Sequence, residues 1–161
     1  MDVFEFALKM ELDGKAYYEK LAAETSIPGF KVIFNRLAED EQKHYDTVMA
    51  ISQGTDVSMA DTTVLDGAKN VFQEVIGDEQ LLGGMKENLQ AYEHAKDIEA
   101  ESIKLYEELA AKETNPQIAA LLRRIAEEEK KHYNIMENLH DFALRPKYYL
   151  EWREFSNLGQ L

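Results

Sequence analysis

The chain has 161 residues, 45% of them hydrophobic, a length that fits one domain with a sizeable core. It contains no cysteine, which excludes disulfides, iron–sulfur clusters, thiolate zinc sites and thiol catalysis. The formal net charge of −13 argues against nucleic acid or an anionic membrane as partner, since both reward clustered lysine and arginine.

The first predicted helix starts with an Asp-x-x-Glu pattern, Asp2 and Glu5, which is typical of a helix N-terminus. Apolar residues then recur on one face, and Glu11 lies in the middle of that face. A carboxylate on an apolar face is costly to bury unless it is paired or binds metal.

The second predicted helix has Pro28 in its first turn and runs to about Ser52. Glu41 and His44 fall on its apolar face. Residues three apart share a helix face, so this Glu-x-x-His pair presents a carboxylate and an imidazole to one point. The pair is half of a candidate metal site.

Residues 53–87 break the pattern, with a possible short helix from about Leu65 to Val75 and a Gly83-Gly84 pair. Such a connection is long for a helical bundle. A helix of ~24 residues spans ~36 Å, and a connection that returns along it needs this reach. We therefore expect a crossover here and no domain boundary.

The third helix is predicted from about Asn88 to Lys112, and Asn115 and Pro116 read as the cap and first turn of a fourth helix. Both repeat the first two helices at a constant offset of 88 residues, which carries His44 onto His132. The offset also relates Glu11 to Glu99, Tyr18 to Tyr106, Pro28 to Pro116, Arg36 to Arg124 and Glu41 to Glu129. Two tandem hairpins related by a two-fold axis predict an up-down-down-up four-helix bundle.

Each of the four helices thus contributes an inward acid, and two of them add a histidine. Oxygen-rich ligands with one imidazole per ion suit iron or manganese, and adventitious zinc also fits. We predict convergence on two metal ions about 3.5–4 Å apart. The competing interpretation, that each motif is a solvated face, is disfavoured by two copies in register. The predicted ligands are Glu11, Glu41, His44, Glu99, Glu129 and His132.

Two tyrosines lie two turns beyond the single glutamates. Tyr18 and Tyr106 have hydroxyls that could support a carboxylate ligand, or could bond backbone carbonyls as ordinary core tyrosines.

Two small residues lie one turn beyond the same glutamates. Gly14 and Ser102 leave room for a small oxidant or for close helix packing. His94 and His140 fall outside the register, and we expect both at the surface.

With these motifs in hand, residues 1 to about 143 resemble the rubrerythrin-like branch of the ferritin superfamily. The resemblance implies an all-α ferritin-like bundle with two iron ions, terminal ligands Glu11 and Glu99, and bridging ligands Glu41 and Glu129. One histidine would bind each ion. Residues 144–161 form an aromatic tail, which we expect to pack on the bundle or on another subunit.

Two departures from the family are visible. Rubrerythrins carry a rubredoxin domain whose iron is bound by four cysteines, which a cysteine-free chain lacks, so electrons must come from an external donor. Lys96 stands where the family has an extra glutamate associated with peroxide reduction.

Three functions remain open from the sequence. The first is a redox enzyme that reacts with peroxide or dioxygen. The second is an iron-handling protein that oxidises Fe(II) and passes it on or stores it, and the third is a helical interaction module with a structural metal. With no basic, apolar leader and no apolar stretch of membrane-spanning length, we expect a soluble cytoplasmic protein, a homodimer or higher homo-oligomer.

Overall fold

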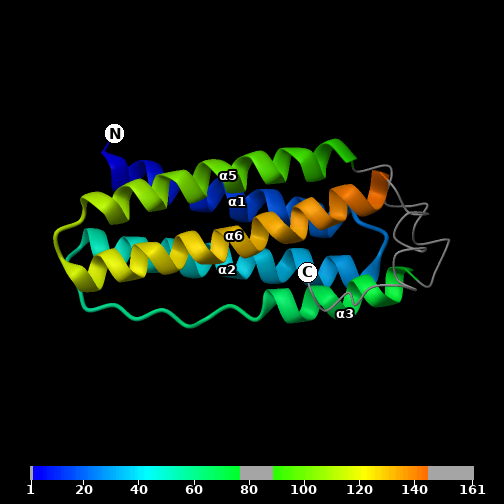
Figure 1. Ribbon diagram of the computed structural model, residues 1–161, viewed down its shortest axis with the longest axis horizontal. Helices are drawn as coiled ribbons and strands as arrows, with labels where there is room; N and C mark the ends of the chain where they lie inside the picture. Colours follow the sequence, from blue (N-terminus) through cyan, green and yellow to red (C-terminus); the bar gives the residue numbers. More distant parts are fainter. Residues whose placement is uncertain (1, 77–88, 145–161) are drawn as a thin grey trace.

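The computed structural model describes residues 2–76 and 89–144, and these residues form helices and connecting segments. Four long helices lie along one axis: α1 (Val3–Glu24), α2 (Pro28–Ser52), α5 (Leu89–Lys112) and α6 (Pro116–Leu144) (Figure 1). The shorter α3 (Val64–Ile76) packs against α2 and α6. The predicted all-α bundle is confirmed. Among the described residues, no helix combines the length and apolar character needed to cross a membrane.

The helix starts follow local sequence signals. The backbone N–H of Glu5 donates to Asp2 Oδ1 at 2.9 Å, and the backbone N–H of Asp2 donates to Glu5 Oε2 at 3.2 Å. These reciprocal bonds satisfy donors that a helix N-terminus leaves free. Pro28 occupies the first turn of α2, and Asn115 Oδ1 accepts the backbone N–H of Gln117 at the start of α6.

The chain direction of the four long helices is up-down-down-up (Figure 1). Helices α1 and α2 form one hairpin, α5 and α6 form the other, and α1 runs antiparallel to α5. Between the hairpins the chain returns along the bundle through residues 53–63 into α3. The predicted crossover is confirmed over residues 53–76, while residues 77–87 and the aromatic tail after Leu144 lie outside the described residues.

The extended part of the crossover is fixed to the bundle by polar contacts. Arg124 Nη2 on α6 donates to the Met59 carbonyl at 2.6 Å and to Asp61 Oδ1 at 2.8 Å. A Cβ added to Gly29 would lie 2.8 Å from Val71 Cγ1, so glycine at this position lets α3 approach the start of α2 closely.

Two apolar clusters fill the bundle on either side of its midpoint. One joins the ends of α1 and α6 and the starts of α2 and α5, and includes Phe30, Phe34, Leu37, Tyr92 and Leu139. The other joins the opposite ends of the same helices and includes Val48, Ile51, Leu122 and Ile125. Buried charged residues occupy the layer between the two clusters.

Candidate metal centre

The six predicted ligands meet in this polar layer, where no residue among them is more than 3% exposed. Their ligand atoms form two overlapping groups, within each of which all atoms lie within 4.8 Å of one another. The groups share two glutamates and differ in the others. The first contains Glu11, Glu41, His44 and Glu129, and the second contains Glu41, Glu99, Glu129 and His132.

Both histidines direct Nδ1 toward the carboxylates of the cluster. His44 Nδ1 lies 2.6 Å from Glu129 Oε1, and His132 Nδ1 lies 3.0 Å from Glu41 Oε1. The two rings stack at a centroid distance of 5.9 Å. The two Glu-x-x-His motifs therefore converge in the structure, and neither histidine lies on an outer face.

The opposite ring nitrogens contact two acids that the sequence analysis did not single out. His44 Nε2 lies 2.9 Å from Glu128 Oε1, and His132 Nε2 lies 2.9 Å from Asp40 Oδ2. An imidazole that donates one N–H to a carboxylate keeps its other nitrogen free to bind metal. Each acid directly precedes a shared glutamate, and the 88-residue offset relates the two. The repeat could therefore have identified them as an equivalent pair of acids, although not their histidine partners.

These outer carboxylates are held in their charged form. Burial alone would raise the pKa of Asp40, but the hydrogen bond and charge of His132 lower it to about 2. Burial likewise opposes ionisation of Glu128, and hydrogen bonds with His44 and Lys43 lower its pKa below the usual value. Both acids therefore stay hydrogen-bond acceptors at neutral pH.

The two tyrosines donate to carboxylates of the cluster. Tyr18 Oη donates to Glu99 Oε1 at 2.5 Å, and Tyr106 Oη donates to Glu11 Oε1 at 2.6 Å. Each tyrosine thus supports the glutamate of the other hairpin. Burial, followed by the negative charge of the carboxylates, raises the pKa of both hydroxyls well above 10.0, so both remain donors.

The pKa values of two inner acids and of both histidines are raised. Burial, followed by repulsion from neighbouring carboxylates, raises the pKa of Glu41 and Glu129 well above the usual value. Burial alone would lower the pKa of His44 and His132, but the charges of Glu11 and Glu99 raise it well above 6.5. A metal-free cluster therefore retains protons at neutral pH.

The donor set fits metal ions in one further respect. Three buried carboxylate oxygens, Glu11 Oε2, Glu99 Oε2 and Glu129 Oε2, have no hydrogen-bond partner within the described structure. A buried polar atom without a partner is costly, whereas a cation can satisfy several carboxylate oxygens at once. Carboxylates with imidazole suit iron or manganese, so the residues fit a pair of divalent ions.

Gly14 lies next to a carboxylate of the cluster. A Cβ added to Gly14 would lie 3.3 Å from Glu41 Oε2, so the glycine gives room to that carboxylate. Its counterpart Ser102 is buried at 4% exposure.

The remaining predictions concern residues outside the cluster. Lys96 places its ammonium 5.9 Å from the centre of the Tyr133 ring, and His94 is exposed as expected. His140 is only partly exposed: its side chain is 16% exposed and its Nε2 lies 2.9 Å from Glu93 Oε2. The register identified both histidines as lying outside the metal cluster, but it could not detect the acid on α5 that faces His140.

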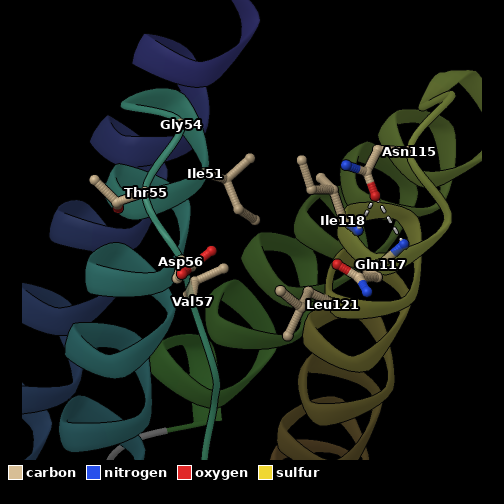
Figure 2. Close-up of a pocket in the computed structure, with 9 residues that line it drawn as sticks. All are labelled: Ile51, Gly54, Thr55, Asp56, Val57, Asn115, Gln117, Ile118 and Leu121. Carbon is tan, nitrogen blue, oxygen red and sulfur yellow. Dashed lines mark hydrogen bonds between the residues drawn. The ribbon is translucent and has the colours of Figure 1, made fainter.

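A hollow of about 440 Å³ lies at one end of the bundle, between the start of the crossover and the start of α6 (Figure 2). Ile51, Val57 and Leu121 contribute apolar side chains to it, and Asn115 caps α6 beside it. Its lining includes one acid, Asp56, and no histidine. The hollow therefore lacks the metal-binding chemistry of the buried cluster.

Fold and polar layer together define a ferritin-like helical bundle whose buried carboxylate–histidine cluster could hold metal ions. The rubrerythrin family model matches residues 2–140, and the chain belongs to the rubrerythrin family. No curated protein and no solved structure matches the chain.

Proposed function

We propose that the protein is a di-iron oxidoreductase that reduces peroxide or dioxygen with electrons from an external donor. The observation that carries the proposal is the sharing of Glu41 and Glu129 by two four-residue groups. Two carboxylates that belong to both groups suit two ions bound next to each other. Bound iron would pass the electrons of the donor to the oxidant by cycling between its +2 and +3 states.

Each side chain then has a specific task. Glu41 and Glu129, which belong to both groups, would help to hold both ions, and each histidine would help to hold one. Glu11 and Glu99 would be terminal ligands, held by the hydroxyls of Tyr106 and Tyr18. Burial of all six ligands excludes bulk water and favours neutralisation of their charge by cations.

The proposal includes both small oxidants. Lys96 occupies the position of the extra family glutamate, and its ammonium lies over Tyr133. The chain therefore has no carboxylate at the position that the family associates with peroxide reduction, and for this reason the proposal includes dioxygen as well as peroxide. The 161 residues contain no cysteine to bind a rubredoxin iron, so the proposal takes its electrons from an external donor.

The test is anaerobic loading with Fe(II), followed by stopped-flow mixing with peroxide or with dioxygen. We expect about two irons per chain, fast oxidation, and repeated turnover when a reductant is supplied. Glu41→Gln with Glu129→Gln is the matched control, because both groups lose their shared carboxylates while side-chain volume is retained. Release of iron, or growth of a mineral core, would instead identify an iron-handling protein and contradict the proposal.

A further inference from the structure

Lys43 on α2 lies over the outer carboxylates of both histidines. Its Nζ lies 2.8 Å from Glu128 Oε1 and 3.6 Å from Asp40 Oδ1. It also donates to the Ala60 carbonyl of the crossover at 2.8 Å. Glu128 and the Ala60 carbonyl lie within hydrogen-bond distance of the ammonium, and Asp40 forms a longer ion pair with it.

The repeat places Lys131 at the position equivalent to Lys43, but the two lysines differ in their contacts. Within the described part of the chain, the Lys131 side chain has no hydrogen bond or ion pair. The difference has a physical cause: the crossover occurs once, and it brings the carbonyl of Ala60 to Lys43. One lysine therefore contacts the outer acids of both halves of the cluster.

The Lys43 side chain is also more exposed than the two acids that it contacts. Surface hollows of about 340 and 390 Å³ are both lined by Lys43, the first together with Asp40 and Thr62 and the second together with Ala60. The Lys43 side chain is 22% exposed, whereas the side chains of Glu128 and Asp40 are 6% and 13% exposed. Loss of the lysine side chain would therefore expose Glu128 to water and would increase the exposure of Asp40.

We propose that Lys43 is a positioning residue for the metal cluster. It fixes Glu128 and Asp40 and shields their contacts with His44 and His132 from water, so that both rings keep Nδ1 directed at the metal positions. An ordinary surface ion pair would do neither, because exposed pairs are mobile and contribute little. The inference rests on the proposed metal-binding function.

The experiment uses the full chain loaded with Co(II), whose paramagnetism shifts the proton resonances of bound histidines. The Nε2–H protons of both histidines should appear as two shifted resonances that exchange slowly with water. In Lys43→Met both should exchange faster, and Co(II) should bind about tenfold more weakly, the lower end expected for loss of an outer partner. Removal of a positive charge would by itself strengthen cation binding, so weaker binding indicates lost positioning.

Two further variants separate positioning from a general effect on the fold. Lys43→Arg keeps the charge and several donors, so it should restore slow exchange. Lys131→Met removes the equivalent lysine and should leave both resonances unchanged. If Lys43→Met does not fold, as judged by melting of the metal-free protein, Lys43→Gln gives the same test with a polar side chain.

The results that overturn the inference differ from those that overturn the proposed function. Unchanged exchange and affinity in a folded Lys43 variant, or equal effects of Lys131→Met, would end the positioning role while leaving the metal site intact. A wild-type chain that binds no Co(II) and no iron would overturn both.

Discussion

The sharing of two glutamates predicts that single ligand changes differ in how many ions they affect. Glu41 belongs to both ligand groups, whereas Glu11 belongs to one. Glutamine at either position keeps the side-chain volume and removes the charge. Glu41→Gln should therefore weaken binding at both positions, and Glu11→Gln should weaken binding at one.

The magnitude follows from linkage between binding and folding. An ion present at about 100 times its Kd stabilises the folded state by about 2.7 kcal/mol, so two ions contribute about 5 kcal/mol. For a chain of this size each kcal/mol raises the melting temperature by about 2–4 °C. The wild-type protein should gain about 10–20 °C, Glu11→Gln about half of that, and Glu41→Gln almost nothing.

The assay is scanning calorimetry of chelator-stripped protein at neutral pH, with and without Mn(II), and with Fe(II) under anaerobic conditions. The metal-free Glu41→Gln protein should melt at or above the wild-type temperature, because a buried acid with a raised pKa destabilises the folded state at neutral pH and glutamine carries no such cost. Equal losses in the two variants would refute the sharing of Glu41. A wild-type melting temperature that changes with neither metal would refute a buried metal site altogether.

Three other predictions concern protons, hydrogen bonds and packing around the cluster. Because the raised pKa values of Glu41 and His44 leave protons on the metal-free protein, metal binding should release protons and should strengthen as pH rises. Calorimetry in two buffers of different ionisation enthalpy measures the proton release, and equal heats of binding in the two buffers would contradict the prediction. Tyr106→Phe removes the donor to Glu11, so competition with a chelator should report metal affinity about tenfold weaker than wild type. Gly14→Ala adds a methyl group 3.3 Å from Glu41 Oε2, so metal should bind more weakly, although the free energy of unfolding of the metal-free protein should rise by up to about 1 kcal/mol. Unchanged metal affinity would show that the carboxylate can move away from the methyl group.

Helix positions and the convergence of the ligands could be predicted because two regularities agree. The helical period assigns Glu11 and Glu41 to inward faces, and the 88-residue offset repeats that assignment in the second half. Two hairpins with the same inward residues can share one core only if they face each other. The direction of α5 relative to α1 followed from this symmetry, as the structure confirms.

The pairing of individual side chains could not be predicted in the same way. Periodicity assigns a residue to a face, but it does not say which residue of a neighbouring helix lies opposite. Tyr18 lies on the stripe of Glu11 and yet donates to Glu99. Asp40 and Lys43 were missed for the same reason, because their partners lie on another helix or on the crossover.

The hydrogen bonds of the buried tyrosines and histidines have a consequence for how the two halves depend on each other. The bonds that Tyr18, Tyr106, His44 and His132 make with acids of the cluster join one hairpin to the other, across sequence separations of 81 to 95 residues. An isolated hairpin would hold one such tyrosine, one such histidine and half of the acids, and would form none of these bonds. The cluster is therefore an interface enclosed within one chain, and the crossover acts as the tether that keeps the halves at an effective concentration on the order of millimolar. Opened into two separate hairpins, the same residues would assemble only by association, and a divalent ion would act as the link between two molecules.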